Sequence, residues 1–525
     1  MHNYKSKIGL ILLLLSTTVV FFLTYGNLDE FYPYNIANAS DLIYFGSGDL
    51  SLTTIGFNTA LSIIVLLLGI TPETMLVLPV CLIPLLVLSF SIFYTITKKR
   101  FWISVLFTIV SLFYISSSTT FLYWVHSVGK VLFLCVVYLF LRYLCAHERS
   151  QRNSLFLCIV IVMFSLNYGS YNTNLTIALF VFGLLGLFVA HTVITNKLAK
   201  TSIGYVPKEQ LLIIVILSVF LIFGLNTFYE SFFAFTDNMG SEGISIYDKI
   251  LVFVNNIFGL GGETTHVLAE YFYEDSAIST PLSTLRMVLV CFTIFIYCLW
   301  ILYSAVNQIS AIRMEDIIIL ALLVGTIVFM IIRVFVVQQI SYSGIIFPAI
   351  LMMARFFSLN APNFKKRAFQ VIPVLFIAIT IILIVLNFST NIYYCEKISS
   401  NPGISALGQW SYSNSENEIA SDVYTYGMIS LSVIQQNAPI RTGTVYDKYS
   451  VFSQYNDYLP LFNNNNPVVS TKDIILNWKL PKLSMSTSDW VNLKPWIVFA
   501  EKISFNPQYN AIYSNGILDY ISATK

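Results

Sequence analysis

Two adjacent carboxylates, Asp29 and Glu30, follow directly on the first apolar stretch of the chain. The stretch from Ile8 to Tyr25 carries no charged residue, so we expect the acidic pair at a membrane surface. A carboxylate in that position can take a proton from a hydroxyl or amine group and act as a general base in group transfer. Neighbouring side chains point in different directions, so we expect only one of the two to reach a substrate. The alternative is a loop carboxylate that contacts water or a lipid headgroup.

Three basic residues, Lys130, Arg286 and Arg333, fall at the predicted outward ends of apolar runs. Arg333 follows sixteen apolar or small residues counted from Ile317, which at about 1.5 Å per residue places it about 24 Å across a hydrocarbon core of about 30 Å. An arginine inside a span costs about 2.5–3.5 kcal/mol, so it usually has a partner. A lipid phosphate is a suitable partner for all three. The alternatives are snorkelling to ordinary headgroups and pairing with a loop carboxylate.

Two histidines on the predicted outer side, His126 and His266, are further candidates for substrate binding, together with Glu263. Glu263 and His266 have the i, i+3 spacing that shares one helical face and could hold a divalent cation. The sequence has no His-Glu-x-x-His, cysteine-pair or Asp-x-Asp motif to complete such a site, so we expect no metal centre. The glycines of 259–262 are too few for a phosphate-cradling loop, and we expect no nucleotide cofactor.

The composition requires a membrane. The chain has 525 residues, of which 56% are hydrophobic and only 11% charged, and its mean hydropathy is +0.74. A soluble protein of this length needs a charged surface that these residues cannot supply. The net charge of +2, without a basic patch, gives no indication of nucleic acid binding. Six of the seven cysteines lie in or beside apolar runs, so no disulfide framework is implied.

The hydropathy pattern predicts an all-α polytopic membrane protein with about eleven transmembrane helices. The run after Met1 lacks a small-x-small cleavage site, so we interpret it as a retained anchor. The predicted spans are 8–25, 74–96, 101–118, 130–146, 153–169, 173–195, 211–228, 286–306, 317–337, 341–357 and 369–388.

The segment 52–70 is also apolar, and it could be a twelfth span. Counting it as a span would place Lys98-Lys99-Arg100 on the outer side of the membrane and would move every later loop to the opposite side. Without it, six basic segments all face the cytoplasm, as the positive-inside rule predicts. We therefore expect 52–70 to be a helix that lies in or dips into the outer leaflet, with a buried short helix as the alternative.

This topology places the N-terminus in the cytoplasm and divides the chain at about residue 390. Residues 1–390 form the membrane domain, with outer loops 26–73 and 229–285. Residues 391–525 are more polar and predict a small extracytoplasmic mixed α/β domain. There the pattern of 511–521 is typical of a hairpin with Asn515-Gly516 as a two-residue turn, and that of Trp496–Ala500 favours a strand.

These features together resemble the GT-C superfamily of membrane glycosyltransferases, especially protein O-mannosyltransferases and lipid A aminoarabinose transferases. The resemblance rests on four segments, three of them in the first hundred residues: Leu28-Asp29-Glu30-Phe31, the half-embedded helix 59–73, Leu78-Pro79 with the closing Lys98-Lys99-Arg100, and Ile512–Gly516 in the outer domain. It implies a polyprenyl-phosphate-linked sugar donor, an acidic first-loop residue that binds or deprotonates the acceptor, and cations that hold the lipid phosphate.

The resemblance has limits that narrow the expected chemistry. The Trp-Trp-Asp-Tyr-Gly signature and the metal-binding acid pairs of oligosaccharyltransferases are absent, so neither N-glycosylation nor a required metal is implied. We expect an inverting transfer to a lipid, glycan or protein acceptor in the cell membrane.

Two other classes stay open: a lipid-linked oligosaccharide flippase or transporter, and a non-catalytic scaffold of the same architecture. A transporter needs ion-coupling acids within the spans, but Glu73, Glu315 and Asp316 sit only at span starts, and no inverted repeat is present.

Overall fold

A computed structural model describes helices for every predicted span. The described residues are 2–24, 43, 55–70, 74–75, 78–115, 125–146, 148–166, 176–187, 189, 208–223, 279–307, 312–337, 343–358, 371–382 and five strands between 419 and 523. The helices are α1 (His2–Thr24), α3 (Ile55–Leu68), α4 (Leu82–Ile96), α5 (Phe101–Ile115), α6 (Val125–Leu144), α7 (Arg149–Leu166), α9 (Lys208–Phe223), α13 (Ser279–Asn307), α14 (Met314–Val337) and α15 (Ser343–Ser358), with further helical segments Thr176–Leu187 and Val371–Ile382.

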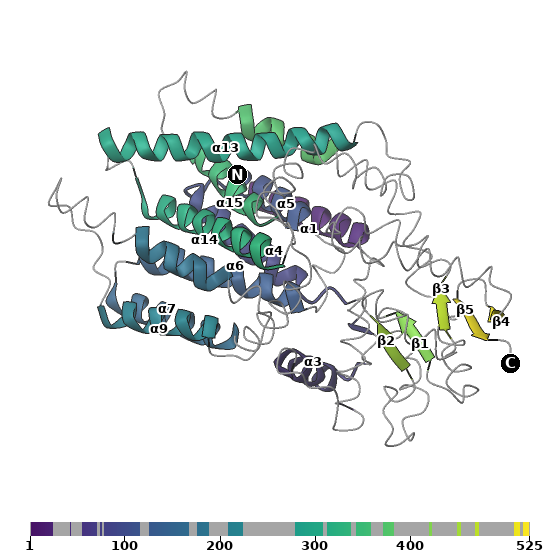
Figure 1. The fold of residues 1–525 in the computed structure, drawn as a ribbon. Coiled ribbons are helices and arrows are strands. Elements are labelled where there is room, and N and C mark those ends of the chain that lie inside the picture. Colours follow the sequence, from purple (N-terminus) through teal and green to yellow (C-terminus); the bar gives the residue numbers. More distant parts are fainter. Residues whose placement is uncertain are drawn as a thin grey trace.

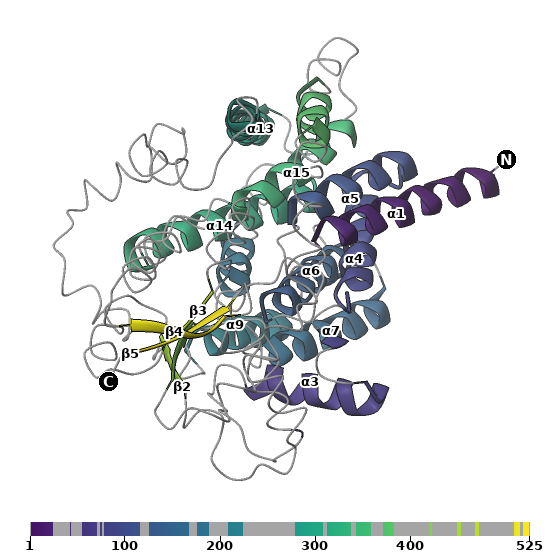
Figure 2. The ribbon, with the colours of Figure 1, turned by 90° about the vertical axis from the view of Figure 1, so that its right-hand side faces the viewer.

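Among the described residues, three helical segments are long and apolar enough to cross a membrane: Ser127–Leu144, Leu285–Asn307 and Met314–Ile331. They support a membrane location. The other apolar helices are shorter within the described ranges, so the total of eleven crossings stays a prediction. Helix α13 is the longest helix of the described residues (Figure 1). In Figure 2 it is seen nearly end-on, while α1 runs across the view.

The outer surface of α13 has the character of a lipid-facing helix. Large apolar side chains are exposed from residue 285 to residue 306, among them Leu285, Phe292, Phe295, Leu302 and Val306. A water-soluble protein rarely exposes so continuous an apolar surface. The exposed face of α13 is therefore suited to hydrocarbon chains.

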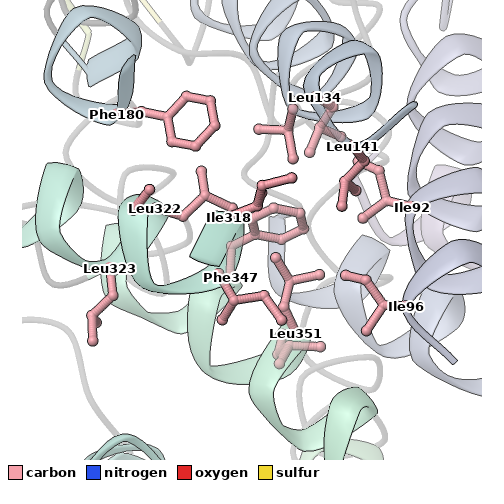
Figure 3. Close-up of a cluster of buried hydrophobic side chains, with 14 of the residues drawn as sticks. Ile92, Ile96, Leu134, Leu141, Phe180, Ile318, Leu322, Leu323, Phe347 and Leu351 are labelled. Atoms are coloured by element: carbon pink, nitrogen blue, oxygen red, sulfur yellow. The ribbon is translucent and has the colours of Figure 1, made fainter. Parts of the chain in front are cut away.

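The core is centred on α15, which is buried on all sides. Nearly every side chain from Ile346 to Phe356 is buried, and α15 packs against α4, α5, α13 and α14. A helix that is apolar around its whole circumference belongs in the interior. Figure 3 shows side chains of four elements meeting there: Ile92 and Ile96, Leu134 and Leu141, Ile318 and Leu322, and Phe347 and Leu351.

One helix starts later than the sequence predicted. The span expected from residue 74 becomes regular helix only at Leu82, the first residue of α4. The residue before a proline is disfavoured in helical conformation, so Leu78-Pro79 delays the start. Pro84, by contrast, lies in the first turn of α4, where a missing N–H costs no intrahelical bond.

Two glycines allow α14 and the segment Thr176–Leu187 to approach closely. A Cβ atom at Gly325 would lie 2.7 Å from the backbone nitrogen of Phe180, and one at Gly183 would lie 3.1 Å from the carbonyl oxygen of Ala321. Small residues at helix crossings let backbones pack together, which is the main source of helix association in membranes. Gly325 is therefore required by the close approach rather than by its backbone angles.

We predict that Gly325→Ala destabilises the helix bundle by about 1–3 kcal/mol, because backbone atoms cannot move aside as a flexible side chain could. Gly186→Ala in the same helical segment is the matched control, since nothing lies within 4 Å of its Cβ position. The measurement is the midpoint of thermal unfolding in detergent. Equal midpoints for the two variants would contradict the close approach.

Helix α3 covers most of the segment 52–70 and lies at the edge of the helical assembly in both views (Figures 1 and 2). One face is buried and includes Asn58, Ser62 and Val65, whereas Leu66 and Leu67 on the other side are exposed. Among the described residues the Asn58 amide has no hydrogen-bond partner. The apolar outward face suits contact with lipid, and the position of α3 in the outer leaflet stays a prediction.

The C-terminal region contributes a five-stranded sheet in the order β2-β1-β3-β5-β4, to the right of the helices in Figure 1. The strands are β1 (Ile419–Asp422), β2 (Tyr449–Phe452), β3 (Val468–Thr471), β4 (Tyr509–Ser514) and β5 (Leu518–Ala523). Strand β1 is parallel to β2 and β3, whereas β5 is antiparallel to β3 and β4. The sheet supplies strands for the mixed α/β domain predicted here, and both that fold class and the domain boundary at residue 390 stay predictions.

The hairpin predicted at 511–521 is present as β4 and β5, and its predicted turn residues, Asn515 and Gly516, lie outside the described residues. Ser514 pairs with Asp519, which leaves four residues between the paired positions. The register shifts between Ala511 and Tyr513, and such a bulge inserts an extra residue on one strand. The two-residue turn therefore stays a prediction. The strand predicted at Trp496–Ala500 lies outside the described residues.

Candidate functional site

The helices have two chemically different ends, and electrostatic contacts fix which residues share each end. Lys98, just after α4, lies close enough to Arg313, Glu315 and Arg355 to interact electrostatically. These residues stand at the start of α14 and near the end of α15. Cys145, just after α6, also interacts with Glu315. We call this the Asp316 end, after the buried carboxylate described below.

The other end contains the starts of α4, α6 and α15 and the end of α14, and we call it the Arg333 end. Arg333 lies four residues before the last residue of α14, Val337. Lys130, in the second turn of α6, interacts electrostatically with Cys81 at the N-cap of α4. Both cations therefore belong to the end that is remote from Asp316.

Arg286 belongs to the same end by its place on α13. It precedes Tyr297 by eleven residues, and the Tyr297 hydroxyl donates a hydrogen bond to Asp316. At about 1.5 Å per residue, Arg286 lies about 16 Å along the helix from that level. The three predicted phosphate-binding cations thus come from three different helices and lie toward one end of the bundle.

Two of these cations are withdrawn in part from solvent. Lys130 and Arg286 are partly buried, and the Nε atom of Arg286 is fully buried. A charged group in low-dielectric surroundings is stabilised by an anion more strongly than an exposed one. The backbones of His126 and Arg333 are helical, and their side chains are outside what the structure describes.

The predicted acidic residues, Asp29, Glu30 and Glu263, lie outside the described residues, as does His266. The direction of α1 nevertheless bears on the first two. A Cβ at Gly9 would overlap the ring of Phe101 at the start of α5, which follows the Asp316-end turn. The N-terminal half of α1 is therefore near the Asp316 end, and α1 runs from there to Thr24 toward the Arg333 end.

No group of three or more metal-ligating side chains occurs in the part of the chain that the structure describes. Glu263 and His266 are not among those residues, so the expectation that this protein needs no metal remains a prediction.

Sequence reasoning missed the strongest polar contact of the described residues. Arg355 on α15 forms an ion pair with Asp316 on α14, with Nε donating to Oδ1 at 2.7 Å and Nη2 to Oδ2 at 2.8 Å. The Tyr297 hydroxyl donates to Oδ1 at 2.6 Å, and the backbone N–H of Arg313 donates to Oδ2 at 2.9 Å. The side chains of Arg355 and Asp316 are only 2% and 0% exposed.

This network is structural in its geometry. Four donors occupy the two carboxylate oxygens, and they link α13, α14 and α15. Asp316 is the third residue of α14, where a carboxylate that reaches back to the N-cap N–H satisfies a helix-end donor. The available sequence signal was Arg355 inside the predicted span 341–357, since an arginine there needs an acidic partner.

Neither a protein-family model nor a curated protein matches the chain. Solved structures do. An oligosaccharyltransferase of Archaeoglobus fulgidus tethered with an acceptor peptide has a TM-score of 0.48 and 11% identity, covering 100% of this chain and 75% of that one. ArnT from Cupriavidus metallidurans in the apo state has a TM-score of 0.46 and 12% identity, and the match covers 99% of this chain and 98% of that one. ArnT bound to undecaprenyl phosphate has a TM-score of 0.45 and 11% identity, and the match covers 98% of this chain and 97% of that one.

Both proteins are GT-C glycosyltransferases, the superfamily that the sequence resembles. The TM-scores are below 0.5 and the identities are 11–12%, so these likenesses carry no argument about a residue or an activity of this chain.

We predict that Arg355→Met destabilises the protein by about 3–5 kcal/mol, because it leaves the Asp316 carboxylate buried without its charged donor. The double variant Asp316→Leu/Arg355→Met removes both charges and should be more stable than Arg355→Met alone. Thermal unfolding in detergent measures both. Additive losses in the double variant would show that the two charges are not coupled.

Proposed function

We propose that this protein is a membrane glycosyltransferase that moves a sugar from a polyprenyl-phosphate carrier to an acceptor on the extracytoplasmic face. The donor is lipid-linked, so the reaction takes place at the membrane surface and requires no nucleotide. The acceptor is a hydroxyl- or amine-bearing lipid, glycan or protein.

The observation that carries the proposal is the shared location of three cations from three helices. Lys130, Arg286 and Arg333 lie toward the Arg333 end, where α1 also ends. Asp29 follows Thr24 by five residues, and five residues span at most about 18 Å. Asp29 is therefore close along the chain to the helix end that the three cations share, which supports the proposal.

The cations are suited to the leaving group. Lysine and arginine form charge-assisted hydrogen bonds with phosphate, and arginine binds it in a bidentate manner. When the sugar–phosphate bond breaks, negative charge grows on the bridging oxygen. Cations that are already in place and partly desolvated stabilise that charge more than water does.

Asp29 is suited to the other side of the reaction. The acceptor oxygen or nitrogen attacks the anomeric carbon, and the carbon–oxygen bond to phosphate breaks with its electron pair remaining on polyprenyl phosphate. Asp29 takes the acceptor's proton as the new bond forms. A single displacement inverts the anomeric configuration. No step needs a metal ion, and Glu30 is the neighbouring acid in the same loop.

We expect Asp29→Asn to lower the rate of transfer by about 10²–10⁴-fold, the range for loss of a general base. The assay uses full-length protein in membranes supplied with labelled polyprenyl phosphosugar. Glu30→Gln is the matched control, because it removes the same charge one residue away and should retain most activity. Transfer at the wild-type rate by the Asp29→Asn variant would overturn the base assignment.

Arg333→Ala is expected to lower kcat/KM for the lipid donor by about 10²-fold, since one preorganised charge near the leaving phosphate is lost. Arg333→Lys should recover part of the loss because it restores the charge without the bidentate geometry. Arg149→Ala, at the start of α7, is the control for removal of an ordinary exposed charge. An unchanged kcat/KM in the Arg333→Ala variant would exclude Arg333 from the donor site.

A transporter and a non-catalytic scaffold remain as alternatives. Asp316 is the one fully buried acid among the described residues, and a buried acid can serve a transporter as an ion-coupling group. Its oxygens are occupied by four donors, which favours a structural role. Wild-type membranes that catalyse no transfer with any polyprenyl phosphosugar would favour either alternative.

A further inference from the structure

The turn that joins α4 to α5 is built from an unusual choice of residues. The N–H of Lys99 donates to the carbonyl of Tyr94 at 2.8 Å, and that of Lys98 to Thr95 at 3.2 Å. This pair of bonds is a Schellman motif, whose first residue beyond the cap is commonly glycine. Here that residue is Lys98, with φ of 55°, and Lys99 follows with φ of 63°.

Two successive lysines in left-handed conformation work against the backbone preference. A Cβ atom crowds the carbonyl in this region, so glycine is favoured and asparagine is tolerated. Within the described part of the chain, Lys98 and Lys99 are the only residues other than glycine with positive φ. The turn by itself would therefore favour glycine, which has no side chain, at both positions.

The charges around this turn are in excess of their partners. In this turn and in the neighbouring parts of α14 and α15, five cations face two carboxylates, namely Lys98, Lys99, Arg100, Arg313 and Arg355 against Glu315 and Asp316. Asp316 is fully occupied by its four donors. The guanidinium of Arg100 donates to the carbonyl of Phe357 near the end of α15, so it caps that helix.

Lys98, Lys99 and Arg313 remain, and no ion pair joins any of them to a carboxylate of the described residues. Lys98 is partly buried and Arg313 is exposed. Burial lowers the pKa of Lys98, and repulsion by Arg313 and Arg355 lowers it further. An anion at this place would relieve that repulsion.

The surroundings indicate an anion that carries hydrocarbon chains. Trp102 lies two residues beyond the turn with its side chain 41% exposed, and Leu106 on the next turn of α5 is 37% exposed. Tryptophan prefers the membrane interface, where its ring contacts both headgroups and acyl chains. A positive turn beside an exposed apolar strip therefore matches a lipid rather than a free ion.

From this geometry we infer that Lys98, Lys99 and Arg313 bind the phosphate headgroup of an anionic phospholipid in the leaflet on the Asp316 side. The positive-inside pattern predicts that this is the cytoplasmic leaflet, which contains anionic lipid. The site is remote from the Arg333 end and is independent of the proposed transferase activity. If these lysines served only to orient the helices in the membrane, their charges could lie anywhere in this loop and would not need residues with left-handed backbone.

The test uses the full-length protein in neutral detergent and measures the thermal unfolding midpoint with added lipid. The variant is Lys98→Gly/Lys99→Gly, and the matched control is Arg142→Gln/Arg149→Gln, which removes two exposed charges at the end of α6 and the start of α7. The probes are phosphatidylglycerol, phosphatidylcholine and inorganic phosphate at equal concentration.

We expect phosphatidylglycerol alone to raise the midpoint of the wild-type and control proteins. The glycine variant should have a higher midpoint than wild type without lipid, since backbone strain is removed, and should lose the increase with phosphatidylglycerol. Lys98→Asn/Lys99→Asn should lose that increase as well.

Three outcomes would overturn the inference. The first is a full increase with phosphatidylglycerol in both the glycine and the asparagine variants. The second is an equal loss in the control, which would indicate a general effect of charge. The third is an increase with inorganic phosphate as large as that with phosphatidylglycerol, or none with either, which would exclude a lipid site.

Discussion

A charge removed from water must be paired, and the Asp316–Arg355 ion pair imposes that requirement where three helices meet. The pair lies between α14 and α15, and Tyr297 adds α13 by a hydrogen bond of 2.6 Å. Sliding any of these helices along its axis would separate buried polar groups, which costs several kcal/mol. The pair therefore fixes the relative heights of α13 and α14, and with them the levels of Arg286 and Arg333.

The two ends of the bundle consequently serve different purposes. At the Asp316 end, the Asp316 carboxylate engages Arg355 and the Phe357 carbonyl engages Arg100, so charge there holds helices together. At the Arg333 end the described residues contribute cations, and the acidic residues of the chain's first loop follow the end of α1. A bundle held rigid at one end can keep several charged groups in place at the other, as a preorganised site requires.

Much of the helical pattern could be predicted from the sequence, because long apolar runs in a membrane have few alternatives to helix. Every predicted span overlaps a described helix. The predicted start of α4 was wrong because Leu78-Pro79 disfavours helical backbone there, and a hydropathy pattern does not record that preference. The hairpin was correct in place, and its bulge near Ala511 could not be predicted, since it depends on pairing with β5. Arg355 was missed because its partner comes from another span. The acids at 29 and 30 stay predictions, as they lie outside the described residues.

The decisive experiment asks whether the cations at the Arg333 end hold the phosphate of a polyprenyl carrier. The full-length protein is photolabelled with polyprenyl phosphate that carries a photoreactive group on its first isoprene unit, and the labelled peptides are mapped by mass spectrometry. We expect label on the first turns of α6, on α13 around Arg286 and on the last turns of α14, reduced by competing polyprenyl phosphate. Label confined to the Asp316 end, or label that competitor does not reduce, would contradict a donor site formed by these cations.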